Sequence, residues 1–109
     1  MSAENSDGVL KLTITHDVQG QGGRYVAHMA DSDHTGLLEW EVQSPSSGED
    51  IRVATHTIVP PEIGGRGVAA RLVERLVADA REKNFKIVPQ CSYVARKFDA
   101  NPEWADLRA

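Results

Sequence analysis

The chain has 109 residues, which is enough for one domain with a single hydrophobic core of modest size. With 40% hydrophobic and 26% charged residues, it has the composition of an ordinary soluble globular protein. Its net charge of −4 argues against a nucleic-acid binder, which would carry a basic surface. No apolar run approaches the roughly 20 residues of a transmembrane helix, so no membrane partner is expected.

The first half of the chain predicts an antiparallel meander of strands. Residues 1–8 are polar, lack the apolar segment of a signal peptide and are expected to be disordered, so that residues 9–109 form the single domain. Turns rich in glycine, serine and aspartate separate segments in which apolar and polar residues alternate. These segments predict four strands, at residues 10–15, 24–30, 37–42 and 51–59.

In the second half the hydrophobic period changes from two to about 3.6, which predicts an amphipathic helix over residues 67–83. The segment Phe85–Val88 predicts a short fifth strand. Because it follows a strand and a helix, it should lie parallel to the fourth strand through a right-handed crossover.

A short helix is expected to close the chain. Ser92 is its predicted N-cap, and Asn101-Pro102 should end it. Trp104 and Leu107 are expected to pin the remaining residues to the body of the domain. The whole pattern predicts a compact α/β (α+β) fold: a four-stranded meander, a long helix, a fifth strand and a short C-terminal helix.

A glycine-rich turn, Pro60-Pro61-Glu62-Ile63-Gly64-Gly65-Arg66-Gly67, joins the fourth strand to the long helix. The start of a helix has free N–H groups and the positive end of the helix dipole, so it is suited to bind a phosphate or pyrophosphate. Arg66 could add a charge-assisted contact to such an anion. The alternative is a tight turn that binds no ligand.

This arrangement resembles the acetyl-coenzyme A signature of the GCN5-related N-acetyltransferases, Arg/Gln-x-x-Gly-x-Gly/Ala after a strand. Gly67 and Ala69 match its last two positions, whereas Gly64 stands where Arg or Gln is usual. The chain is also similar to a short, single-domain branch of that family with a cysteine after the fifth strand. The segments that carry this similarity are His56-Thr57-x-Val59-Pro60-Pro61, Gly65-Arg66-Gly67, Pro89-x-Cys91-Ser92-Tyr93-Val94 and Asn101-Pro102-Glu103.

The resemblance implies an acetyltransferase-like fold and an enzyme that transfers an acetyl group from acetyl-coenzyme A to an unidentified amine. The backbone of the fourth strand would pair with the pantetheine arm, and one of its N–H groups would hold the oxyanion. The glycine turn would hold the pyrophosphate. The implied cofactor-binding residues are Thr57, Ile58, Val59, Gly64, Gly65, Arg66, Gly67, Val68 and Ala69.

Cys91 and His56 are the predicted catalytic residues. In the family fold the fourth and fifth strands splay around the thioester, where the Cys91 thiol would protonate the leaving thiolate or carry the acetyl group. A helix that starts near Ser92 would lower the pKa of this thiol. The alternative for Cys91 is a small buried apolar residue. His56 could accept a proton from the amine, and its alternative is a structural histidine hydrogen-bonded across the sheet.

Other polar residues allow weaker predictions. His16, His28 and His34 do not have the spacing of metal ligands, so no metal is expected. Glu39 and Glu41 project to one face of the third strand, where they could attract an amine or simply face water.

Two alternative functions remain open at this point. The helices that larger family members carry between their first strands are missing, which favours a non-catalytic module that binds or senses acyl-coenzyme A. A protein-interaction domain with a purely structural glycine turn is the second alternative. The single cysteine is consistent with a reducing compartment, so a cytoplasmic protein is expected, as a monomer or weak dimer.

Overall fold

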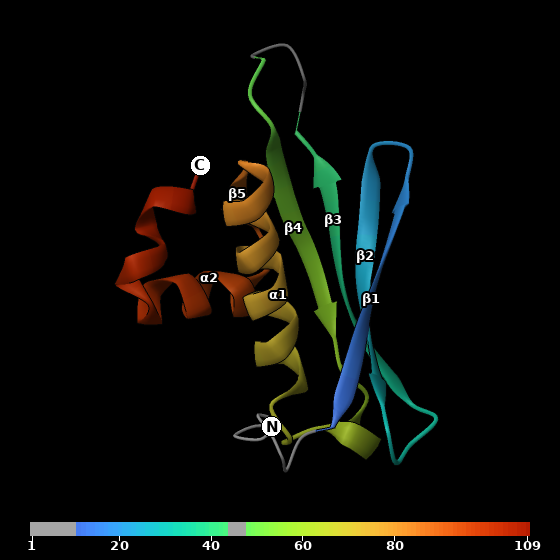
Figure 1. Cartoon of the computed structure of the whole chain (residues 1–109). Helices are drawn as coiled ribbons and strands as arrows, with labels where there is room; N and C mark the ends of the chain where they lie inside the picture. Colours follow the sequence, from blue (N-terminus) through green and yellow to red (C-terminus); the bar gives the residue numbers. More distant parts are fainter. Residues whose placement is uncertain (1–10, 44–47) are drawn as a thin grey trace.

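A five-stranded sheet is the frame of the protein in the computed structural model, which describes residues 11–43 and 48–109 (Figure 1). The strands are β1 (Leu12–Gln19), β2 (Gly22–Met29), β3 (Thr35–Val42), β4 (Ile51–Ile58) and β5 (Lys86–Pro89). They lie side by side in chain order, β1 to β4 antiparallel and β5 parallel to β4. The predicted meander and the predicted parallel fifth strand are both confirmed.

The described helices lie on one side of this sheet, except for a short one at the end of the sheet where β4 stops (Figure 1). They are the α-helices α1 (Val68–Lys83) and α2 (Ser92–Ala100) and the 3-10 helices η2 (Pro61–Ile63) and η3 (Pro102–Leu107). The long helix α1 ends at Asn84, whose left-handed backbone (φ 60°) is one that asparagine tolerates. None of the helices in residues 11–43 and 48–109 is long and apolar enough to cross a membrane.

The sheet therefore has a closed face, covered by α1, and an open face without a helix from the described residues. On the closed face, Tyr25, Leu38 and the α1 residues Leu72 and Leu76 are completely buried. Each such side chain contributes about 1.5–3 kcal/mol to the free energy of folding through removal from water. The side chains between them along β2 and β3 project to the open face, because alternate residues of a strand point in opposite directions.

A β-bulge in β4 decides which side chains reach which face. The register between β3 and β4 shifts by one residue between Glu39 and Trp40, so Thr55 is an extra residue in β4. The Thr55 hydroxyl donates a hydrogen bond to the Glu39 carbonyl oxygen (3.2 Å). Past the bulge, Thr57 lies opposite a buried leucine of β3 on the closed face, whereas His56 lies opposite Glu39 on the open face.

Some predicted boundaries are wrong. The turn expected at residues 19–23 is shorter, because Gly22 and Gly23 pair with both β1 and β3 and so begin β2. The N-cap of α2 is Cys91, not Ser92. Residues 1–8, Leu10 and part of the polar loop before β4 lie outside the described residues.

The segment after α2 forms a 3-10 helix, η3. The prediction that Trp104 and Leu107 pin this segment is confirmed. Trp104 packs edge-on against Phe98 of α2 with ring centroids 5.4 Å apart, and Leu107 is buried. The backbone then pairs with β5, since the Ala109 N–H donates to the Ile87 carbonyl oxygen (2.8 Å).

Candidate active site

The strand β4 is paired on both sides along its first half and on one side along its second half. The pairing with β5 runs from Ile51, opposite Lys86, to Ala54, opposite Pro89. The Cys91 N–H then donates to the Ala54 carbonyl oxygen (2.9 Å), and the chain turns into α2. No described strand pairs with this side of β4 beyond Ala54. We call residues 55–58 along this side the unpaired edge of β4.

Cys91 lies beside this unpaired edge. Its Sγ is 3.6 Å from Thr57 Oγ1, and the residue is partly buried against the core. As the N-cap of α2, Cys91 lies where a side chain normally faces the free N–H groups of the first helical turn.

These surroundings favour the thiolate of Cys91. Burial alone would raise its pKa, but the N–H of Val94, the hydroxyl of Thr57 and the N–H groups of Tyr93 and Thr57 stabilise the negative sulfur more strongly. The pKa of Cys91 is therefore lowered from its ordinary value. Thr57 belongs to the unpaired edge of β4, so this edge contributes to the stabilisation of the Cys91 thiolate.

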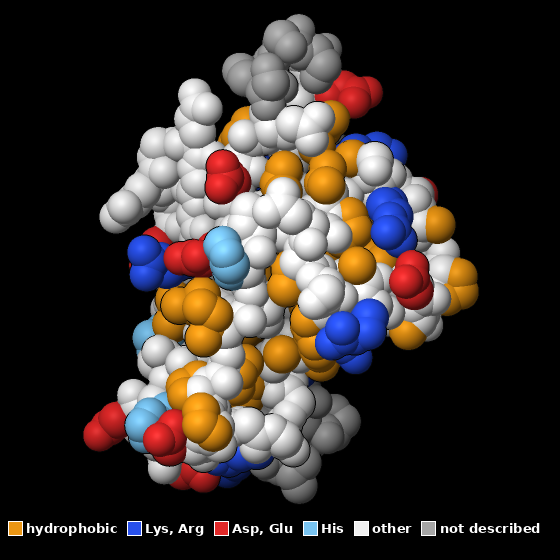
Figure 2. Space-filling model, turned by 180° about the vertical axis from the view of Figure 1, so that it is seen from behind, with side chains coloured by type: hydrophobic (Ala, Val, Ile, Leu, Met, Phe, Trp, Pro, Cys, Tyr) orange, Lys and Arg blue, Asp and Glu red, His pale blue; other side chains and the backbone are white. Residues whose placement is uncertain are grey.

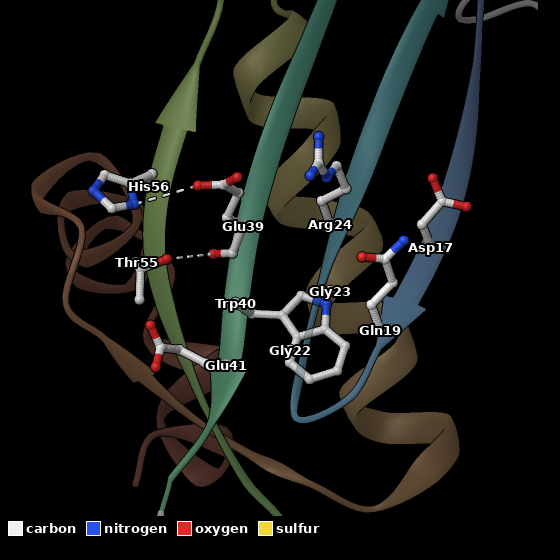
Figure 3. Close-up of a pocket in the computed structure, with 10 residues that line it drawn as sticks. All are labelled: Asp17, Gln19, Gly22, Gly23, Arg24, Glu39, Trp40, Glu41, Thr55 and His56. Carbon is white, nitrogen blue, oxygen red and sulfur yellow. Dashed lines mark hydrogen bonds and ion pairs between the residues drawn. The ribbon is translucent and has the colours of Figure 1, made fainter.

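His56 lies on the other face of the sheet. Its Nδ1 is 3.5 Å from Glu39 Oε1, and its side chain is 66% exposed (Figure 3). The two predicted catalytic residues are thus adjacent to the same stretch of β4 but on opposite faces. The structure brings Cys91 to Thr57 rather than to His56. The bulge at Thr55 is the reason, because it turns Thr57 to the closed face and His56 to the open face.

The backbone of the glycine turn leaves the start of α1 uncovered. Gly65 and Gly67 have φ of 72° and 82°, in the left-handed region that favours glycine. Gly67 is the N-cap of α1 and makes no side-chain cap, so it leaves the first N–H groups of the helix uncovered. Gly64, with φ of −70°, has a backbone that other residues adopt readily.

The side chains around the turn contribute less than its backbone. Arg66 is held by an ion pair with Asp31 in the turn after β2 (3.1 Å) and would have to exchange that partner for a phosphate. Val68 is buried, so only its backbone is available to a ligand, whereas Ile58 on β4 is 55% exposed. The neighbouring Val59 and Ala69 are partly buried.

Two residues on the open face were not predicted from the sequence. Asp17 lies opposite Arg24 in the register of β1 and β2, and Arg24 lies opposite Glu39. With His56 they form one row across four strands. The alternation of residues along each strand indicates that these side chains share a face. Only the register between neighbouring strands determines that they lie in one row. In the described residues, no group of His, Cys, Asp and Glu side chains could hold a metal ion.

A comparison with known protein families decides the family. The sequence model of a family described as GCN5-related N-acetyl-transferase matches residues 24–107, from β2 to the end of η3. The chain belongs to the GCN5-related N-acetyltransferase family. The match covers the glycine turn, the unpaired edge and Cys91, so these features belong to an acetyltransferase fold. Membership supports acyl transfer as the general activity of the protein.

Proposed function

We propose that this GCN5-related N-acetyltransferase binds acetyl-coenzyme A along the unpaired edge of β4 and transfers the acetyl group to a primary amine. The observation that carries the proposal is the Cys91 thiol, held at the N-cap of α2 beside Thr57 with a lowered pKa. A thiol that favours its thiolate next to unpaired backbone is suited to attack a thioester.

The residues present fit the coenzyme. The uncapped N–H groups at the start of α1, with the left-handed Gly65 and Gly67, would hold the pyrophosphate together with Gly64, Arg66, Val68 and Ala69. The backbone of Thr57, Ile58 and Val59 would pair with the pantetheine arm as an added strand. The coenzyme supplies the thioester whose acetyl group is transferred.

We assign to Cys91 the role of nucleophile rather than general acid, because a lowered pKa favours the thiolate. Its sulfur would form a bond to the acetyl carbonyl carbon while the bond to the coenzyme sulfur breaks and the coenzyme leaves as a thiolate. The Thr57 N–H, one of the groups that lower the pKa of Cys91, would hold the oxyanion. The acceptor amine would then attack the acetyl-Cys91 carbonyl and release the Cys91 thiolate.

His56 would take the proton that the amine loses in this second step. Its neighbour Glu39, whose Oε1 lies 3.5 Å from His56 Nδ1, would hold the ring from one side. Because His56 is on the open face, the amine would approach from that face. It would reach acetyl-Cys91 past the unpaired edge of β4.

Calorimetric titration with acetyl-coenzyme A, followed by intact mass measurement of the same sample, tests this proposal. We expect saturable binding and a mass gain of one acetyl group, which is lost in Cys91→Ser and kept in the control Ser92→Ala. Absence of binding at high cofactor concentration would reject the proposal. Binding without acetylation would reject the nucleophile role and leave direct transfer or a non-catalytic binding module, which an acceptor screen separates.

A further inference from the structure

The open face of the sheet carries a hollow of about 580 Å³ next to His56 (Figure 3). It lies over the ends of β1, β2 and β3 that are farthest from the glycine turn. The side chains and backbone around it come from Asp17, Gln19, Gly22, Gly23, Arg24, Glu39, Trp40, Glu41, Thr55 and His56. His56, the proposed catalytic base, is therefore part of the wall of the hollow.

The hollow exists because one strand position on this face has no side chain. Gly22 pairs with Gln19 of β1 and Glu41 of β3, and all three face the open side. A Cβ at Gly22 would lie 3.0 Å from the Trp40 carbonyl oxygen, so the strands approach closely there. The floor is consequently backbone, and the flanking side chains form the walls.

The charge around the hollow is predominantly negative. Asp17, Glu39 and Glu41 contribute carboxylates, against the single guanidinium of Arg24. Glu39 faces His56, whereas the carboxylates of Asp17 and Glu41 form no ion pair with any residue in the described part of the chain. Two carboxylates without an ion pair lower the electrostatic potential of a groove and attract a cation.

An apolar row runs beside the charged one. Val26, Leu37 and Ile58 lie opposite one another across β2, β3 and β4, and Ile58 is the most exposed of them. Seen from behind, the molecule shows apolar side chains next to a histidine and charged side chains on this face (Figure 2). The open face thus offers an apolar strip and an acidic hollow on either side of His56.

We propose that the open face binds an extended polypeptide segment that presents a lysine side chain to His56. This rests on the proposed function, because it assigns the acceptor of the same reaction. An apolar residue of the segment would lie on the row of Val26, Leu37 and Ile58, and a basic residue would enter the hollow between Asp17 and Glu41. Charge complementarity identifies a cationic partner, and the apolar row distinguishes a polypeptide from a simple polyamine.

Binding to the full chain without coenzyme tests this inference independently of catalysis. The probe is a capped peptide of one leucine and two lysines separated by serines, titrated at low salt into ¹⁵N-labelled protein. We expect amide shifts concentrated on the open-face residues of β2 and β3. Glu41→Gln should weaken binding by about threefold to fivefold, the effect of one exposed ion pair. Glu82→Gln, the same change of charge at an exposed position of α1, should leave the affinity unchanged.

Three results would overturn the inference: shifts confined to another surface, equal effects of Glu41→Gln and Glu82→Gln, or tighter binding of spermidine than of the peptide in the same hollow. A peptide that binds on the open face of a protein that binds no acetyl-coenzyme A would reject the proposed function and keep the docking surface. The two failures are therefore distinguishable.

Discussion

Each face of the sheet carries a histidine next to a carboxylate, in opposite surroundings. On the closed face, His16 stacks on Tyr25 with ring centroids 4.0 Å apart and accepts a hydrogen bond from Trp40 Nε1 (3.1 Å). Its other nitrogen, Nδ1, lies 4.0 Å from the buried Asp79. On the open face, His56 lies 3.5 Å from Glu39 and is mostly exposed. The same pair of residue types is part of a packed network on one face and accessible to a ligand on the other.

The two faces place different demands on a polar side chain. On the closed face, a polar side chain must have its hydrogen-bonding partners, because an unsatisfied buried group is costly. On the open face, carboxylates can remain without partners in water. Cys91 and Thr57 lie at the boundary, beside the strand edge that β5 leaves unpaired. Substitutions on the closed face should therefore change mainly the free energy of unfolding. Substitutions on the open face or at the boundary should change mainly the rate of acetyl transfer.

The largest effect is expected at this boundary. Cys91→Ala should lower the rate of acetyl transfer at least about 100-fold, because it removes the proposed nucleophile. The free energy of unfolding should change by less than about 1 kcal/mol, since one thiol is lost from a partly buried site. Initial rates and urea unfolding measure the two quantities. Full activity of Cys91→Ala on a verified acceptor would contradict the assignment.

A pair of variants compares the two faces directly. Tyr25→Phe should lower the free energy of unfolding by about 1–3 kcal/mol, because the Tyr25 hydroxyl donates to the buried Asp79 (2.8 Å). Glu39→Gln should change stability by less than about 0.5 kcal/mol but slow acetyl transfer, because it weakens the support of His56. Chemical denaturation and rates per folded molecule separate the effects. Equal losses in the free energy of unfolding for both variants would contradict the view that only the closed face depends on satisfied polar side chains.

Two alanine variants of the glycine turn form a matched pair, and their effect on stability and coenzyme binding is expected to be smaller. Gly67→Ala places a Cβ at φ 82° and should cost about 1–2 kcal/mol of stability, and it should weaken acetyl-coenzyme A binding. Gly64→Ala should be tolerated, because its φ is −70° and the new Cβ would make ordinary contacts, the nearest 3.5 Å from the Pro61 carbonyl oxygen. Thermal unfolding measures the stability of the two variants, and calorimetry measures their affinity for acetyl-coenzyme A. Equal losses in both variants would contradict this prediction.

The buried histidine predicts a pH dependence. Burial lowers the pKa of His16 below its ordinary 6.5, and the Asp79 carboxylate offsets this only in part. The unfolded chain therefore binds a proton more readily than the folded one as the pH falls through 6.5. This contribution to stability is complete above that pH and is lost below it. Denaturant unfolding across this range should show the loss in the wild type and a smaller one in His16→Gln.

The smallest effect is expected for the Thr57 hydroxyl. Thr57→Val removes one of the groups that stabilise the Cys91 thiolate, so the pKa of Cys91 should rise. Thr57→Ser should keep it nearly unchanged. The rate of Cys91 alkylation by iodoacetamide as a function of pH measures this. Identical profiles for all three proteins would show that the Thr57 hydroxyl has no such role.

Much of the fold and part of the candidate site could be predicted from local patterns. Alternation along the first strands and the helical period after Gly67 identified the elements, because side-chain periodicity depends on the backbone of one segment. The left-handed conformations of Gly65 and Gly67 follow from sterics within a few residues. The position of Cys91 after β5 could also be anticipated, although its role as the N-cap of α2 could not.

By itself, the sequence determined the order of the strands and helices, the glycine turn and the residue types available for chemistry. Only the tertiary structure decided where those residues meet. The extra residue Thr55 turns His56 to the open face and Thr57 toward Cys91, and the register aligns Asp17 and Arg24 with Glu39. Asp31 holds Arg66 across a sequence separation of 35 residues. Sheet register and such distant pairs depend on neighbouring strands, so no local pattern specifies them.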